Sequence, residues 1–211
     1  MFNEIKKNLV IIGAGYGGIS LANKLKNNSN VKITLINKTS YHLHQTDIHK
    51  YISGKSNFED IAFDLNNYSK NSKINFIEAC VNDILFDERK IILDSNETLN
   101  YDYLVIATGS VSFFPKQIKN INEYSQDIKD INILKKQRED FLDLIKLKKD
   151  KKNIAIIGGG LSGIEIALEF ANVLKERNII LVVLLYFFTF GIYPIYLFFA
   201  LNSEIRNEAL K

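Results

Sequence analysis

The chain has 211 residues, of which 46% are hydrophobic and 24% charged, a balance typical of folded globular proteins and not of disordered ones. A single cysteine excludes a disulfide scaffold and a cysteine-rich metal site, and a formal net charge of +3 is too small for a nucleic-acid footprint. We therefore expect no metal site and no nucleic-acid partner. The low cysteine usage fits a reducing compartment, so a cytoplasmic location is expected.

The first third of the chain is predicted to begin with a strand, a helix and a second strand. The apolar run Asn8–Ile12 ends in glycines, which is typical of a strand buried on both faces of a parallel sheet. Residues 19–26 have helical spacing, and Val31–Asn37 predicts the second strand. The polar segment 38–72 is interpreted as loops and short helices.

Further strands are predicted at Ile74–Ala79 and Leu104–Ala107, with a small hairpin formed by Lys90–Leu93 and Thr98–Asn100. Later in the chain, Leu161–Arg177 predicts an amphipathic helix after a repeat of the opening apolar pattern. Strands that alternate with helices favour an α/β fold with a mostly parallel sheet.

Five segments are expected from these patterns. They are a first dinucleotide-binding domain (1–114), a linker with a surface helix (115–152), the start of a second such domain (153–178), an apolar segment (179–201) and a polar tail (202–211). The apolar segment carries no charged side chain and is long enough to cross a bilayer as a helix. Two interpretations of it stay open: a membrane span, or an aberrant C-terminus.

The first motif with chemical content is Gly13-Ala-Gly15-Tyr-Gly-Gly18, which has G-x-G-x-x-G spacing between a predicted strand and a predicted helix. Such glycines allow a tight turn, close approach to a pyrophosphate and close helix–strand packing. The N-terminus of the helix offers N–H groups to the phosphates. A dinucleotide site is therefore predicted here.

A second motif of the same spacing, Gly158-Gly-Gly160-Leu-Ser-Gly163, again lies between a predicted strand and a predicted helix. Two such motifs in one chain suggest two adenine dinucleotides, with electrons passing from one to the other. A third motif, Ala107-Thr108-Gly109, ends a buried strand with small residues that permit close backbone approach.

Together these motifs resemble the FAD-dependent pyridine nucleotide oxidoreductases, over about residues 7–177. Within that family, the segments Ile33–Leu43 and Gly160–Glu165 look like those of type II NADH dehydrogenases. The resemblance implies a Rossmann-like FAD-binding domain followed by the start of an NAD(P)-binding domain. It also implies hydride transfer from NAD(P)H to FAD and passage of the electrons to a quinone.

The resemblance also implies roles for individual residues. Glu165 would face the nicotinamide and the flavin, and the alternative is a carboxylate favoured in the first helical turn by the helix dipole. Gln45 would lie near the flavin. The cofactor-binding residues would be Gly13, Ala14, Gly15, Gly17, Gly18, Asn37, Lys38, Val81, Ala107, Thr108, Gly109, Gly158, Gly160 and Gly163.

Two features depart from the family pattern. The second strand ends in Asn37, where the family has an acid that accepts hydrogen bonds from the FAD ribose, so a weaker bond is expected. After the second motif, the family has an acid that binds a ribose, and its expected position falls near residues 181–190, which contain no Asp or Glu.

Side chains outside the motifs narrow the choice of subfamily. Only Cys80 exists, so the dithiol of the family's disulfide reductases cannot form, and Cys80 is expected to be buried in a strand. Sulfide:quinone reductases, which also work through cysteines, are disfavoured. His42, His44 and His49 are expected to be loop residues, solvated or beside the cofactor.

Three interpretations therefore remain. The chain is a type II NADH dehydrogenase-like enzyme or another FAD-dependent NAD(P)H oxidoreductase, or a non-catalytic FAD- or NAD-binding fragment, or a non-functional truncated product. We expect truncation, because the second domain stops early. The enzyme interpretation brings membrane association at the cytoplasmic face and a homodimer as further expectations.

Overall fold

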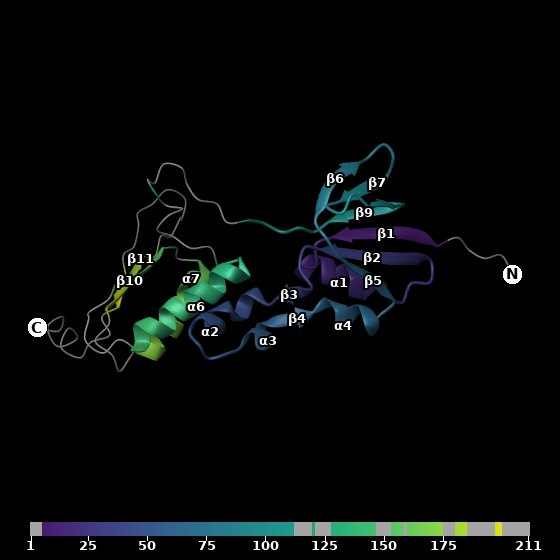
Figure 1. Ribbon diagram of the computed structural model, residues 1–211. Helices are drawn as coiled ribbons and strands as arrows, with labels where there is room; N and C mark the ends of the chain where they lie inside the picture. Colours follow the sequence, from purple (N-terminus) through teal and green to yellow (C-terminus); the bar gives the residue numbers. More distant parts are fainter. Residues whose placement is uncertain are drawn as a thin grey trace, which may run out of the picture. The chain divides into compact units, whose positions relative to one another are not determined.

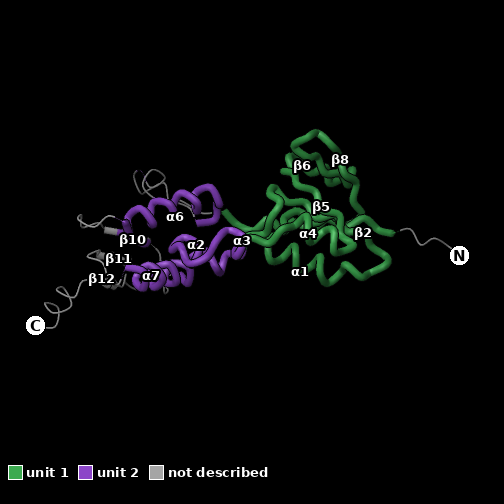
Figure 2. Tube along the Cα trace, turned by 60° about the horizontal axis from the view of Figure 1, so that its bottom comes forward, with its two compact units in different colours: residues 1–43, 62–111 green, residues 44–61, 112–211 purple. Residues whose placement is uncertain are grey.

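The computed structural model describes residues 6–111, 120, 128–146, 153–157, 160–174, 180–184 and 197–199. The chain forms two compact units (Figure 2). Unit 1 consists of residues 1–43 and 62–111, and unit 2 of residues 44–61 and 112–211. The segment 44–61, which the sequence groups with the first glycine motif, is thus part of unit 2.

Unit 1 is built on a four-stranded sheet whose neighbouring strands are all parallel (Figure 1). In spatial order the strands are β5 (Ile74–Glu78), β2 (Val31–Asn37), β1 (Lys7–Ile12) and β9 (Tyr103–Ile106). Helix α1 (Tyr16–Leu25) connects β1 to β2. The predicted α/β fold with a parallel sheet is confirmed.

Both faces of this sheet are covered, which explains why its central strands are continuous apolar runs. On one face, Leu9, Ile11, Ile33 and Leu35 pack with Ala22 of α1 and with Leu65 of α4 (Leu65–Lys70). On the other face, Val10, Ile12 and Ile36 pack against Ile91 and Leu93. Those last two residues belong to a second, antiparallel sheet of unit 1.

That second sheet has the order β6 (Val81–Leu85), β7 (Lys90–Leu93) and β8 (Thr98–Asn100). It contains the predicted hairpin of β7 and β8. A further antiparallel pair, β3 (Tyr41–Leu43) with β4 (Ala62–Asp64), was not expected from the sequence. Strands of three residues are too short to show a period of two, so only their pairing across 18 intervening residues reveals them.

Unit 2 contains short helices from the inserted segment: η1 (Gln45–Asp47), α2 (Ile48–Ile52) and α3 (Phe58–Ile61). Of these, α2 packs against both longer helices, α6 (Ile131–Lys146) and α7 (Leu161–Leu174). The rings of Phe141 in α6 and Phe170 in α7 stack with centroids 3.9 Å apart. Both long helices agree with the sequence, which predicts a surface helix within 115–152 and an amphipathic helix at Leu161–Arg177.

A three-stranded sheet completes the described part of unit 2. Strand β10 (Asn153–Ile157) pairs in parallel with β11 (Ile180–Leu184), and β11 pairs antiparallel with β12 (Leu197–Phe199). With α7 between its first two strands, this is a second β–α–β unit, as the second glycine motif predicts.

The described residues of the apolar segment 179–201 are strands, β11 and β12, and not the bilayer-spanning helix that length and lack of charge allow. β11 takes the place of the second strand that a dinucleotide-binding unit needs beside its first. Across the part of the chain that the structure describes, no helix is long and apolar enough to cross a membrane.

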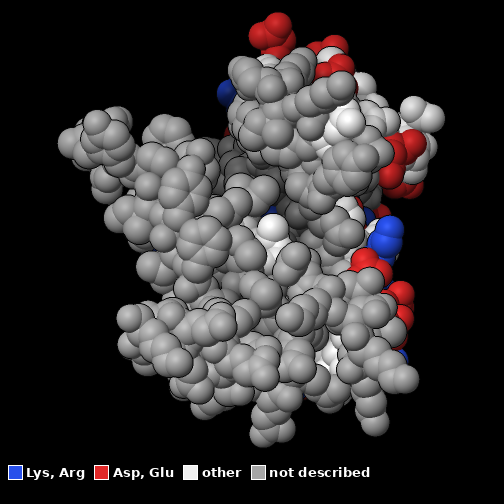
Figure 3. Space-filling view, turned by 90° about the vertical axis from the view of Figure 1, so that its left-hand side faces the viewer, with Lys and Arg blue, Asp and Glu red and all other residues white. Residues whose placement is uncertain are grey.

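Charged side chains of both signs occur on one face of the described residues. On the face shown in Figure 3, acidic side chains (red) and basic side chains (blue) of described residues lie next to one another. This mixture agrees with the formal net charge of +3 for the whole chain.

Candidate functional site

The predicted cofactor residues of unit 1 meet at the carboxyl edge of the parallel sheet, where β1 turns into α1. Gly13 has φ +102°, a conformation that side chains rarely adopt, and its N–H donates to the Ile36 carbonyl at 2.7 Å. A Cβ at Gly13 would lie 2.7 Å from the Ala107 carbonyl carbon. The structure thus brings the first glycine motif and the Ala107-Thr108-Gly109 motif together.

The other glycines of the turn have different surroundings. A Cβ at Gly18 would overlap the Gly13 carbonyl oxygen and lie 3.1 Å from its carbon, so Gly18 is needed for the helix to pack on the turn. A Cβ at Gly17 would meet nothing within 4 Å, and one at Gly15 only the Ala107 oxygen at 4.0 Å. The turn is therefore packed on the side of Gly13 and Gly18 and open on the side of Gly15 and Gly17.

The open side carries the N-terminus of α1. Gly15 is the N-cap residue, with an extended backbone and no side chain to bond the first amides. The first N–H groups of a helix have no intrahelical acceptor, and together they attract anions. These residues fit the pyrophosphate of a dinucleotide.

Asn37 lies at the end of β2, beside this turn. Its Oδ1 accepts a hydrogen bond from the Ala14 N–H at 3.0 Å. Its Nδ2 donates to the carbonyl and hydroxyl oxygens of Thr39, at 2.9 and 3.1 Å. The side chain predicted to meet a ribose is thus bonded on both sides within the protein.

The remaining predicted residues of unit 1 surround this edge. Lys38 is exposed directly after β2, and Thr108 and Gly109 are exposed directly after β9. Val81 begins β6, two residues after Ala79, whose N–H donates to the Asn37 carbonyl at 2.9 Å.

The second glycine motif lies in unit 2. Gly158 is outside the described residues. Gly160 precedes α7, where its carbonyl accepts from the Ile164 N–H at 3.1 Å, and a Cβ there would meet nothing within 4 Å. Gly163 is partly buried in the first turn of α7.

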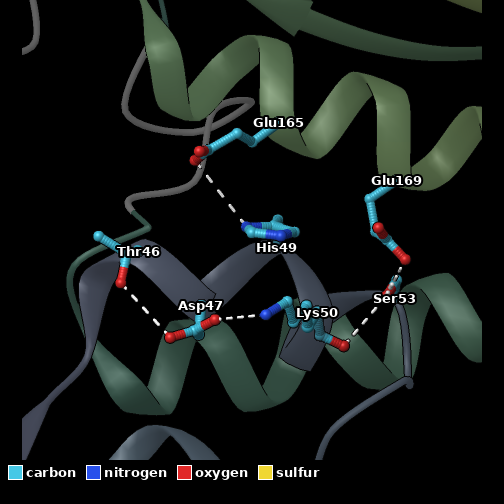
Figure 4. Close-up of polar contacts among 7 residues, drawn as sticks. All are labelled: Thr46, Asp47, His49, Lys50, Ser53, Glu165 and Glu169. Carbon is cyan, nitrogen blue, oxygen red and sulfur yellow. Dashed lines mark hydrogen bonds and ion pairs between the residues drawn. The ribbon is translucent and has the colours of Figure 1, made fainter.

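Glu165, the predicted catalytic residue, lines a small pocket of unit 2. Its Oε2 lies 3.9 Å from Nδ1 of His49 in α2, and Figure 4 shows the two side chains pointing toward each other. Their side chains are 33% and 16% exposed. Gln45 and Ser162 contribute polar groups to the same pocket, which the structure thus assembles from η1, α2 and α7.

One helical turn further along, α7 makes a second polar contact with the segment after α2. Glu169 forms an ion pair with Lys55. It also accepts a hydrogen bond from the Ser53 hydroxyl at 3.4 Å (Figure 4). Beside it, Lys50 Nζ lies 2.7 Å from Asp47 Oδ1. That hydrogen bond lowers the pKa of Asp47 and raises the pKa of Lys50.

Arg138 of α6 holds the end of α2. Its Nη1 donates to the carbonyl oxygens of Tyr51 and Ser56, the latter at 2.8 Å. The guanidinium also lies over the Tyr51 ring, 4.8 Å from the centroid. Burial raises the pKa of the Tyr51 hydroxyl, and the charge of Arg138 partly opposes this.

One expectation about a single residue is wrong: Cys80 is exposed and lies in the link between β5 and β6, not buried in a strand. For His42 the expected loop is wrong, because the residue lies in β3 and is only 7% exposed. Of the two surroundings expected for His42, solvent or the cofactor side, the structure places it beside the first glycine turn. The strand β3 is defined by its pairing with β4, which the local sequence does not reveal.

The comparison with known protein families bears directly on the two glycine turns. The family described as pyridine nucleotide-disulphide oxidoreductase matches residues 7–185. The chain belongs to this family. The family predicted from the glycine motifs is thereby confirmed, and the match runs through both motifs into the strand after α7.

Among curated members of the family, the type II NADH:quinone oxidoreductase of Staphylococcus haemolyticus is 32% identical over 185 residues. The match covers 82% of this chain and 44% of that protein. The enzyme of the same name from Staphylococcus aureus is 30% identical over 181 residues, with 81% and 44% covered. The chain thus spans less than half the length of these relatives.

Solved structures give the same picture. The sulfide:quinone oxidoreductase of Aquifex aeolicus is similar with a TM-score of 0.75 and 27% identity, covering 88% of this chain and 44% of that one. NDH2 from Plasmodium falciparum, solved in complex with NADH, has a TM-score of 0.69 and 26% identity, covering 81% and 38%.

The sequence predicted no specific role for His42 or His49, which it placed in a loop, solvated or beside the cofactor. In the structure His42 bonds the first glycine turn, and His49 faces Glu165. One signal for His49 was available, because Gln45, predicted near the flavin, lies one helical turn before it.

Proposed function

We propose that this chain forms the nucleotide-binding part of an NAD(P)H-dependent flavoprotein oxidoreductase that passes electrons to a quinone. Membership of the family implies FAD as the cofactor and NAD(P)H as the substrate. The observation that carries the proposal is the turn Gly13–Gly18, closed by backbone at Gly13 and Gly18 and open at Gly15 and Gly17. This arrangement suits a pyrophosphate on the N-terminus of α1.

FAD would be held by the carboxyl edge of the unit 1 sheet. The glycine turn and α1 would meet the pyrophosphate, and Asn37 with Lys38 would lie at the adenosine. When bound, the flavin supplies the redox chemistry, accepting hydride from the nicotinamide and releasing electrons to the acceptor. The role of these residues is to bind and orient it.

NAD(P)H would bind at the second β–α–β unit, with Gly160 and Gly163 at the start of α7. Glu165 lies just past the first turn of that helix, next to His49. An acid at this place would orient a nicotinamide amide group by accepting its hydrogen bond. Glu165 would therefore position the substrate and would not abstract a proton, because hydride transfer needs no general base.

Quinone as the acceptor is supported by the relatives, since the Staphylococcus enzymes and the Aquifex aeolicus structure are both named for it. Between the two quinone-linked classes, the NADH-dependent one is favoured, because the curated relatives matched at 30–32% identity carry that name.

A quinone acceptor implies work at a membrane surface, and we propose peripheral association at the cytoplasmic face. Flotation with liposomes of anionic and neutral lipids tests this, and a protein that stays in the dense fraction with both would contradict it. A homodimer is also proposed, and light scattering of the purified chain, with a monomer mass as the contradicting result, tests that.

FAD binding is the first experiment. The full chain, purified and incubated with FAD, should retain flavin after gel filtration and quench its fluorescence in titration. The Gly13→Val variant is the matched negative control, because a side chain there meets the Ala107 backbone. If wild-type and variant both fail to retain flavin, the proposed function is wrong.

Turnover is the second experiment. Oxidation of NADH with a soluble quinone is measured for the flavin-loaded chain, and Glu165→Gln should lower this rate about tenfold without changing FAD retention. Flavin retention with no NADH oxidation by wild-type would instead support the non-catalytic binding interpretation.

A further inference from the structure

Both backbone polar groups of Ala14, the residue in the middle of the first glycine turn, are bound by side chains of unit 1. The Ala14 N–H donates to Asn37 Oδ1 at 3.0 Å. The Ala14 carbonyl oxygen lies 2.8 Å from Nδ1 of His42. We call this pair of contacts the Ala14 clamp.

The His42 contact determines the state of the imidazole ring. A carbonyl oxygen only accepts hydrogen bonds, so Nδ1 must carry a proton and donate it to Ala14. The ring is held in place from two sides: β3 pairs with β4 at His42 and Phe63, and Tyr16 meets the ring edge-on with centroids 4.8 Å apart. His42 therefore presents a fixed donor to the turn.

The Asn37 contact is equally directed. Its Nδ2 donates to the carbonyl and hydroxyl oxygens of Thr39, and this orients the amide so that Oδ1 faces Ala14. A carboxylate could not donate to Thr39 in this way. The amide that departs from the family pattern thus serves the turn from the neighbouring strand.

We propose that Asn37 and His42 are positioning residues that keep the first glycine turn in its nucleotide-binding shape before any nucleotide arrives. Four of the six residues of the motif are glycines, and without such contacts a glycine-rich segment would sample many conformations. If the turn has its binding-competent shape only part of the time, its apparent affinity for a nucleotide falls in proportion to that fraction. The ligand in this inference rests on the proposed function, but the clamp itself does not.

Two variants of His42 separate the hydrogen bond from the packing of the ring. His42→Phe keeps a ring against Tyr16 but removes the donor. His42→Asn removes the ring but places an amide N–H near the position of Nδ1. His44→Phe makes the same substitution two residues away, at a side chain outside the clamp, and is the matched control.

The first measurement uses the full chain without flavin. Amide hydrogen exchange, followed by NMR at Ala14 and Gly15, should be about tenfold faster in His42→Phe than in wild-type, and near wild-type in His42→Asn and His44→Phe. The ¹⁵N spectrum of wild-type should show the His42 ring protonated at Nδ1. A ring protonated only at Nε2 would overturn the clamp, whether or not any variant folds.

The second measurement is FAD titration by fluorescence. The dissociation constant should rise about tenfold in His42→Phe and stay within about threefold of wild-type in His42→Asn. If His42→Asn weakens binding as much as His42→Phe does, the role of His42 is packing and the proposal is overturned. If wild-type binds no FAD, the proposed function fails, while the exchange rates still decide the clamp.

Discussion

Adding one methyl group to neighbouring glycines of α1 should have opposite effects on stability. In Gly18→Ala the new Cβ would overlap the Gly13 carbonyl oxygen and lie 3.4 Å from Ile11 Cγ2. In Gly17→Ala the Cβ would meet nothing within 4 Å. Both positions lie in the first turn of the same helix, so the change in helix propensity is the same.

The expected magnitudes follow from these surroundings. The atoms that crowd Gly18 are mostly backbone, so no side chain can rotate away, and overpacking of this kind costs about 3 kcal/mol. Alanine regains about 1 kcal/mol of helix propensity, which leaves a net loss of about 2 kcal/mol. Gly17→Ala has only the gain and should stabilise by about 0.5–1 kcal/mol.

Urea unfolding, followed by circular dichroism, measures both variants against wild-type. With a slope of about 2 kcal/mol per molar urea, the midpoint should fall by about 1 M in Gly18→Ala and rise by up to about 0.5 M in Gly17→Ala. Equal midpoints for the two variants would refute the close packing of α1 on the turn that the nucleotide site requires.

Three further predictions test neighbouring features. In Gly15→Ala the new Cβ would meet only one atom, at 4.0 Å, so the urea midpoint should not change. FAD binding, measured by fluorescence titration, should weaken by about tenfold or more, and an unchanged affinity would show that the phosphates do not lie on this side of the turn. Arg138→Met should lower stability by about 1–2 kcal/mol in urea, because two carbonyl oxygens lose their donor, and an unchanged midpoint would contradict that role. The N–H of Asn8 donates to the Asp102 carboxylate at 2.7 Å, which lowers the pKa of that carboxyl below its usual value of 3.8. The stability that the ionised carboxylate contributes is present above pH 3.8 and is lost as the pH falls through the lowered pKa. Between about pH 6 and about pH 3, the urea midpoint should therefore fall less in Asp102→Asn than in wild-type.

The elements with strong local signals were predictable. Glycine spacing after an apolar run placed the turn between β1 and α1, and the run itself predicted a strand covered on both faces. The same signals predicted the second β–α–β unit around α7. These features depend on residues close in the sequence, so local patterns are sufficient.

The features that sequence reasoning missed depend on distant partners. His42 contacts residues that are distant in the sequence: its bond to Ala14 spans 28 positions, and its ring also meets Tyr16. His49 meets Glu165 only because α2 packs on α7, and the sequence holds no mark of that pairing. A histidine in a polar segment therefore looked like a loop residue in both cases.

The segment between β3 and β4, residues 44–61, also affects how the protein folds during synthesis. It leaves the ribosome long before α6 and α7, the helices that it packs against, so it cannot form these contacts until the helices have been synthesised. Its two ends are already joined by the hydrogen bond from the His44 N–H to the Ile61 carbonyl at 2.7 Å. No single cut in the chain separates the two units, and an expression fragment that starts after Val111 would lack the helices on which α7 rests.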